Sequence, residues 1–170
     1  MSERADGRGR RGAVVIGLGN PLMGDDGVGL AALERLRARL GVDGAPADVE
    51  LLDGGTWGMS LLPTLEDAEA VLLLDAIDVG AAPGTPVRLE GAAIPAALAL
   101  KVSPHQIDFR EVLAVMQLRG TVPPRMVALG VQPATFQSAP VGSPEDPWAN
   151  GLSPSVEAAL EDLVARAHAE

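Results

Sequence analysis

Three side chains in this sequence are of types that could bind a divalent metal ion or move a proton: Asp26, Asp75 and His105. Carboxylate oxygens and an imidazole nitrogen together suit a borderline ion such as nickel or zinc. Because three ligands drawn from three segments leave coordination positions open, such a set indicates a catalytic or recognition site and not a structural one. The same groups could also act as a general acid or base.

Asp26 belongs to the turn 17–29, which follows a first apolar run and precedes a first helical pattern. A dinucleotide-binding loop is one interpretation, but it would need glycine where Leu22 stands. The adjacent Asp25 and Asp26 would also meet a pyrophosphate with negative charge. Capping of the following helix explains one aspartate. We therefore assign Asp25 to the cap and expect Asp26 to project into a crevice.

Asp53 and Asp75 each stand at the end of an apolar run. Asp53 enters Gly54-Gly55-Thr56, where the glycines permit a left-handed turn and Thr56 can cap a helix that starts near Trp57. Turn hydrogen bonding is a sufficient explanation for a lone aspartate at a strand end. Parallel strands, however, would bring Asp26, Asp53 and Asp75 to one carboxyl edge, and this convergence predicts a shared crevice.

His105 lies in Ser103-Pro104-His105-Gln106, which has the pattern of a capping box with proline at the first helical position. The positive end of a helix dipole disfavours the imidazolium, leaving a neutral ring that can bind a metal ion or accept a proton. Simple packing at a helix start explains His105 equally well when the residue is considered alone. The other histidine, His168, is expected to be solvated.

The elements that must position these side chains alternate along the chain. Near-continuous aliphatic runs predict buried parallel strands at 13–19, 49–52, 71–75 and 126–131. Apolar residues spaced three and four apart predict helices over 30–40, 109–116 and 156–164. Residues 86–90 suggest an edge strand, and 134–151, rich in Pro, Ser and Gly, a long surface loop. The fold class is therefore a single α/β domain of three layers, with a twisted, mostly parallel sheet between helices.

The charge of the chain excludes one class of partner. Thirteen Lys and Arg minus 23 Asp and Glu give a net charge of −10, so a nucleic-acid backbone would be repelled. The first twelve residues carry +2, which leaves −12 on the rest. We predict a flexible basic tail over 1–12 and one domain over 13–170. Without cysteine or an apolar run long enough for a membrane span, we expect a cytoplasmic protein with no membrane partner.

Several hydrolase motifs are absent. The sequence lacks the His-Glu-x-x-His of zinc metalloproteases, the Gly-x-Ser-x-Gly elbow and a Walker loop. The missing cysteine also excludes thiolate metal sites and a cysteine nucleophile. Any hydrolysis must therefore use carboxylates, His105 or a metal ion that is supplied from outside the protein.

The motifs taken together resemble one family, the nickel–iron hydrogenase maturation endopeptidases. The resemblance covers about residues 13–163 and rests on the turn at 17–29, Asp53-Gly54-Gly55-Thr56-x-Gly58-Met59, Asp75-Ala76-Ile77-Asp78, Pro83-Gly84-Thr85, Ser103-Pro104-His105-Gln106, Gly130-Val131-Gln132-Pro133 and Gly151-Leu152-Ser153-Pro154-x-Val156-Glu157. It implies a peptidase domain over 13–170 that removes a C-terminal peptide from the large-subunit precursor of a hydrogenase after nickel insertion. It also implies that Asp26, Asp75 and His105 contact nickel supplied by the substrate, with Asp25, Asp53, Gly54, Gly55 and Thr56 in support.

Two mechanisms fit this resemblance. In one, the three side chains hold the substrate's nickel, and the ion polarises a carbonyl group or a water molecule. In the other, Asp26 or Asp75 is the general base, as in an aspartic-type protease. We expect the free enzyme to be a monomer without stoichiometric metal. The loop Phe136–Asn150 and the tail look longer than in the family, so both could select the precursor.

Two other functions compete with the protease. The first is a nickel-binding maturation chaperone that uses the same crevice without catalysis. The second is a hydrolase like the peptidyl-tRNA hydrolases. In this sequence, Gly17-Leu18-Gly19-Asn20-Pro21 resembles the opening motif of those enzymes. Those enzymes carry a histidine with an adjacent asparagine soon after this motif, and a basic surface for tRNA. Here Asp25 and Asp26 follow, and the domain is acidic.

Overall fold

The protein was analysed as a computed structural model, which describes residues 11–41, 44–56, 58–94, 104–136 and 151–170. Its sheet has five strands in the order β2-β1-β3-β5-β4, and only β4 runs antiparallel to its neighbour. The strands are β1 (Arg11–Leu18), β2 (Val49–Gly55), β3 (Ala68–Ala76), β4 (Pro86–Glu90) and β5 (Arg125–Val131). The mostly parallel sheet confirms the predicted fold class.

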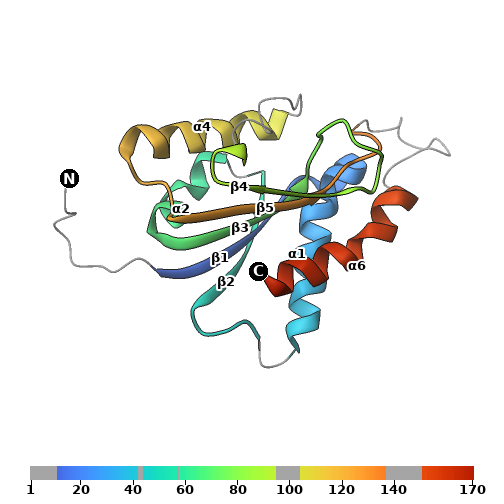
Figure 1. The fold of residues 1–170 in the computed structure, drawn as a ribbon, viewed down its shortest axis with the longest axis horizontal. Helices are drawn as coiled ribbons and strands as arrows, with labels where there is room; N and C mark the ends of the chain where they lie inside the picture. The colour runs from blue at the N-terminus through green and yellow to red at the C-terminus, as the bar shows by residue number, and fades with distance from the viewer. Residues whose placement is uncertain (1–10, 42–43, 57, 95–103, 137–150) are drawn as a thin grey trace.

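Helices cover both faces of the sheet and complete the three layers (Figure 1). One face carries α1 (Val28–Leu40) and α6 (Pro154–Ala169), and the other carries α2 (Leu62–Asp67) and α4 (Pro104–Arg119). Two short 3₁₀ helices, η1 (Pro21–Gly27) and η3 (Gly58–Leu61), precede α1 and α2. Val14 and Ile16 pack under α2 and α4, whereas Val15 packs under α1 and α6, because successive strand residues point to opposite faces.

The strands agree with the predicted runs, and some extend beyond them. The edge strand Pro86–Glu90 has the predicted bounds. Asp53 does not end β2 as expected, because Gly17 and Leu18 of β1 still pair with Asp53 and Gly55. Helix α4 begins at Pro104, as the position of the proline predicts, but its expected cap Ser103 lies outside the described residues. Residues 1–10 of the predicted tail and 137–150 of the predicted loop also lie outside them. The tail is predicted to extend to residue 12, but Arg11 and Gly12 belong to β1.

The order of the strands creates one special position at the carboxyl edge. The connection from β1 leads to β2 on one side, whereas the connection from β3 leads to β4 on the other side. Neighbouring parallel strands whose connections leave in opposite directions form a crevice at their carboxyl ends, where α/β proteins bind ligands. Gly17 pairs with Asp53 on one side and with Leu74 on the other, so the loops after β1, β2 and β3 emerge side by side.

Candidate functional site

Glycines bring the turn after β1 onto the ends of the strands. A Cβ on Gly29 would lie 2.2 Å from the Leu74 carbonyl oxygen and 2.4 Å from that of Leu18, so α1 starts directly against β1 and β3. Gly19 has a φ of +114°, and a Cβ there would lie 1.8 Å from the Asp26 carbonyl oxygen. Only glycine fits such approaches without displacing backbone. Both adjacent aspartates are thereby carried into the molecule.

Asp26 is a buried carboxylate, 2% exposed, within η1. Its Oδ2 accepts a hydrogen bond of 2.8 Å from the backbone N–H of Asn20. Asn20 is also the N-cap of η1, and its own Oδ1 accepts from the Leu22 N–H at 3.0 Å. The turn therefore fixes Asp26 next to the end of β1.

Asp75 is another buried carboxylate, 4% exposed, near the end of β3. Its Oδ1 accepts from the Ala76 N–H at 2.8 Å. Strand alternation puts Asp75 on the same face as Leu73 and Ile77, which pack in the cluster under α4. His105 lies in the first turn of α4, on that face of the sheet, but its side chain lies outside those that the structure describes.

The assignment of Asp25 to the helix cap is wrong. The N-cap of α1 is Gly27, which makes no side-chain capping bond. The Asp25 side chain, 1% exposed, instead accepts three hydrogen bonds: from the Ala134 N–H at 2.8 Å, from the Ser153 N–H at 2.7 Å and from the Ser153 hydroxyl at 2.9 Å. The intervening η1 places Asp25 two residues before the cap, where its carboxylate ties the turn to the segments after β5 and before α6.

The predictions for residues 53–56, at the end of β2 and just after it, are only partly confirmed. Asp53 pairs with Gly17 at the same edge, but its side chain is exposed. Gly55 adopts the expected left-handed conformation, with a φ of +41°, whereas Gly54 remains extended strand and would bring a Cβ within 2.5 Å of the Ile16 side chain. A short helix does start near Trp57, namely η3, and α2 follows it with Leu61 as its N-cap. The predicted cap by Thr56 stays a prediction.

Sequence reasoning missed the role of Gln132, a buried side chain directly after β5. Its Oε1 accepts from the N–H groups of Val79 at 2.8 Å and Ala81 at 3.1 Å, and its Nε2 donates to Asp78 Oδ1 at 2.8 Å. Gln132 therefore fixes the loop after β3 against β5. The one available signal is a polar residue at the end of an apolar strand and before a proline.

Comparison with known proteins finds this fold and these motifs in one family. The sequence model of a family described as "Hydrogenase maturation protease" matches residues 31–170. The chain belongs to this family. The hydrogenase expression/formation protein HupD of Rhodobacter capsulatus is 39% identical over 155 residues, which are 91% of this chain and 68% of that protein. The hydrogenase 2 maturation protease of Escherichia coli K12 is 34% identical over 149 residues, 87% of this chain and 83% of the relative.

A solved structure agrees with this membership. The hydrogenase maturating endopeptidase HybD from E. coli is 32% identical and superposes with a TM-score of 0.76, covering 91% of this chain and 88% of HybD. The resemblance inferred from the motifs is thus confirmed, and the chain is a peptidase. None of the helices in the described part of this protease has both the length and the apolar character that a bilayer span requires.

The described side chains of the protease do not themselves form a complete metal site. Among them, no three His, Asp or Glu groups are arranged to hold an ion. Two members of the predicted set, Asp26 and Asp75, belong to adjoining elements, since η1 contacts β3. The third, His105, has its side chain outside the described ones. The predicted ligand set therefore stays a prediction.

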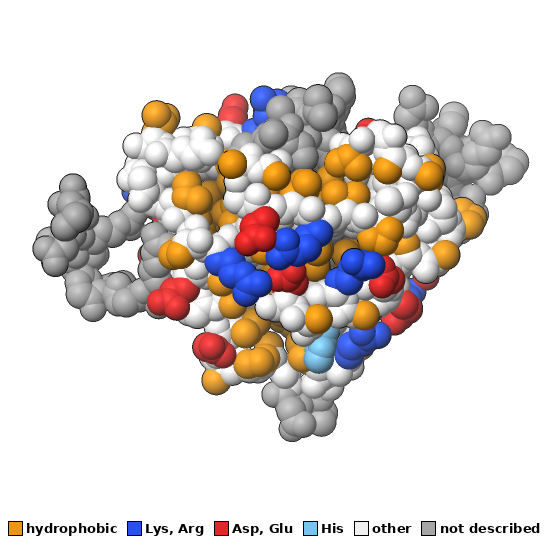
Figure 2. Space-filling view, in the orientation of Figure 1, with side chains coloured by type: hydrophobic (Ala, Val, Ile, Leu, Met, Phe, Trp, Pro, Cys, Tyr) orange, Lys and Arg blue, Asp and Glu red, His pale blue; other side chains and the backbone are white. Residues whose placement is uncertain are grey.

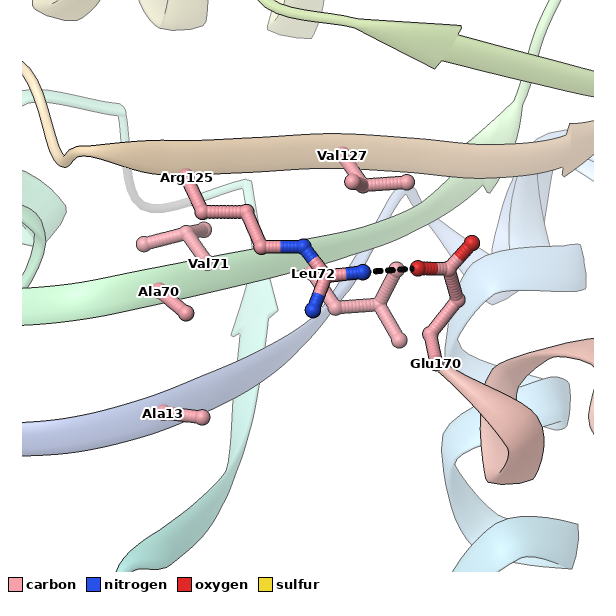
Figure 3. Close-up of a pocket in the computed structure, with 7 residues that line it drawn as sticks. All are labelled: Ala13, Ala70, Val71, Leu72, Arg125, Val127 and Glu170. Carbon is pink, nitrogen blue, oxygen red and sulfur yellow. Dashed lines mark hydrogen bonds and ion pairs between the residues drawn. The ribbon is translucent and has the colours of Figure 1, made fainter.

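A pocket of about 80 Å³ lies elsewhere in the protease. Its lining residues come mainly from the amino halves of β1, β3 and β5, and Glu170 closes one side through a hydrogen bond of 2.7 Å from Arg125 (Figure 3). The lining is Ala13, Ala70, Val71, Leu72, Arg125, Val127 and Glu170. Because the pocket lies at the edge of the sheet opposite Asp26 and Asp75, we do not assign the peptidase chemistry to it.

Proposed function

We propose that this protease removes a C-terminal peptide from the nickel-loaded large-subunit precursor of a nickel–iron hydrogenase. One observation carries the proposal: the buried side chains of Asp26 and Asp75 lie at the carboxyl edge of β1 and β3 in a member of a hydrogenase maturation protease family. Burial of carboxylates is costly unless positive charge or hydrogen bonds compensate it. The described segments at this edge, 19–27, 53–56, 58–61, 77–85 and 132–136, contain no Lys or Arg. A cation that arrives with the substrate would complement them.

In this proposal Asp26, Asp75 and His105 bind the nickel that the precursor already carries. The placement of Asp75 and the first turn of α4 on one face of the sheet supports the pairing of an oxygen and a nitrogen ligand. Binding the ion fixes the position of the neighbouring peptide bond, and the ion polarises its carbonyl group or a water molecule. A second route, with Asp26 or Asp75 as general base, uses the same residues.

In this proposal the free enzyme is a cytoplasmic monomer. It holds no resident metal ion, because the substrate brings the ion with it. The cysteine-free sequence supports the reducing compartment. Elemental analysis of the purified protein tests the metal content. One tightly held nickel or zinc ion per chain would contradict a substrate-borne ion.

A processing assay tests the function. Nickel-loaded and nickel-free precursor are each mixed with the protein, and loss of a C-terminal peptide is followed by mass. We expect cleavage of the loaded form alone. Nickel bound tightly by this protein, with neither precursor cut, would support the chaperone instead.

Substitutions in the same assay test the residues. Asp26→Ala, Asp75→Ala and His105→Ala should each abolish processing, as should the isosteric Asp26→Asn and Asp75→Asn, which keep the volume of the buried side chains. Asp67→Ala, at an exposed aspartate at the end of α2, is the matched control and should process like wild type. Full activity in any of the site variants would remove that residue from the site.

A further inference from the structure

Large hydrophobic side chains are exposed at few places in the described part of the protein. They are Leu22 (42% exposed), Met59 (43%), Val79 (45%), Leu118 (89%) and Val122 (39%). Leu118, near the end of α4, and Val122, in the segment before β5, lie toward the amino edge of the sheet. The other three lie at the opposite edge, one on each of three loops.

The three loops are those that follow β1, β2 and β3. Leu22 is in η1, Met59 is in η3 and Val79 comes three residues after the end of β3. Since β1 lies between β2 and β3, these loops emerge next to one another, at the edge that also holds Asp26 and Asp75. We call Leu22, Met59 and Val79 the apolar rim.

Hydrogen bonds and packing hold the backbone of the apolar rim in place. The Val79 N–H donates to the buried Gln132 side chain at 2.8 Å, and the Leu22 N–H donates to Asn20 at 3.0 Å. Met59 lies in η3, which packs against α4. A ligand that covers the rim would therefore have little protein backbone to order, which favours binding.

The charge around the apolar rim restricts what can cover it. The described segments at this edge contribute Asp25, Asp26, Asp53 and Asp78 and no Lys or Arg. An acidic partner would be repelled, whereas an apolar segment that carries no Asp or Glu, or that carries a cation, is compatible. Apolar side chains exposed on neighbouring loops beside a functional site are available to a polypeptide partner.

We propose that the apolar rim docks an apolar, non-acidic segment of the polypeptide substrate beside the bond to be cut. This inference rests on the proposed function, because an endopeptidase must hold its substrate chain next to the reacting atoms. Leu22, Met59 and Val79 act here as substrate-binding residues, and take no part in the chemical step. The apolar contacts supply affinity that a metal ion alone would not, and they let the enzyme recognise a protein and not a free ion.

The test uses the full chain and the nickel-loaded precursor. Leu22→Asp, Met59→Asp and Val79→Asp each add a negative charge and remove an apolar contact, so kcat/KM should fall about tenfold or more, equivalent to about 1.4 kcal/mol of binding. The loss should appear mainly as a higher KM. Leu118→Asp, the same change at an exposed leucine of the opposite edge, should leave both constants unchanged, and Leu22→Met should keep most of the affinity.

The outcomes separate the two proposals. If wild type cuts the precursor and the three rim variants cut it with an unchanged KM, the apolar rim is refuted and the proposed function stands. A lower kcat with unchanged KM and a lower melting temperature would show a structural role and would also refute the rim. If wild type cuts neither form of the precursor, the proposed function fails and the rim proposal falls with it.

Discussion

Replacing Asp25 by Asn should destabilise the protein strongly although the two side chains have the same shape. Asp25 is 1% exposed, and each of its carboxylate oxygens accepts from a backbone N–H: Oδ1 from Ser153 and Oδ2 from Ala134. In either orientation the amide NH₂ of an asparagine would therefore face a donor. One N–H loses its acceptor, and the remaining bond loses the charge that strengthens it.

The size of the effect follows from these bonds. A hydrogen bond to a charged group contributes about 1.5–3 kcal/mol, and a buried donor without a partner costs about 1–3 kcal/mol. We therefore expect Asp25→Asn to lower the free energy of unfolding by about 2–4 kcal/mol. That is a large share of the roughly 5–15 kcal/mol that stabilises an ordinary domain.

Urea unfolding at pH 7, followed by circular dichroism, measures this change. Ser153→Ala is the control, since it removes the hydroxyl bonds to Asp25 and Ser155 but keeps both backbone N–H bonds to the carboxylate. It should cost about 1.5 kcal/mol, the low end of the range for a bond to a charged group. The Ser153 side chain makes no capping bond, so the start of α6 does not confuse the comparison. If Asp25→Asn lay within about 0.5 kcal/mol of wild type, as ordinary surface changes do, the reasoning would be refuted.

Two further substitutions test other parts of the structure. Gly29→Ala should cost about 3 kcal/mol or more, because its Cβ would lie 2.2 Å from the Leu74 carbonyl oxygen. Gly120→Ala, where a Cβ meets nothing but φ is +65°, should cost only about 1–2 kcal/mol in the same unfolding assay; equal losses would contradict the close approach. The hydrogen bond from Arg88 lowers the pKa of Glu170, against desolvation, which raises it. Glu170→Gln should therefore lower the melting temperature at pH 7, and this difference should close as the pH falls below about 4.3, the ordinary value for glutamate. A difference that persists at lower pH would show that the charge of Glu170 does not cause it.

The sequence was sufficient to predict the elements that form the sheet and the edge that holds the buried acids. Apolar runs and helical spacing are local signals, and parallel strands separated by helices leave few topologies. The same local reasoning predicted a carboxylate at the end of β1 and another near the end of β3. Both are buried at the predicted edge.

Contacts between distant segments could not be predicted in this way. Asp25 was assigned to a helix cap because capping is the local use of an aspartate before a helix. Its actual partners, Ala134 and Ser153, are more than 100 residues away in the sequence. Gln132 likewise bonds to Val79 and Ala81, across the border between β3 and β5. Such bonds depend on the finished fold, and no spacing within one segment indicates them.

The charged side chains behind the net charge of −10 are distributed unevenly over the structure. Figure 2 shows basic and acidic side chains side by side in a band across one face of the molecule. Among the ion pairs of the protein, Arg88 and Arg125 both pair with Glu170. Between helices α1 and α6, Arg35 pairs with Glu157 and Glu161. Exposed pairs of this kind contribute little stability. Their basic residues belong to α1, β4 and β5, and none lies in the loops at the carboxyl edge.

That edge combines acidic side chains with the apolar rim, and the two features make different demands on a ligand. A free cation would satisfy the acids and leave the rim exposed. An apolar peptide without a cation would cover the rim but bring no positive charge to the acidic side chains. A polypeptide that already carries its metal ion, as we propose for the substrate, would meet both demands, and this edge would then select the loaded substrate without a separate sensing device.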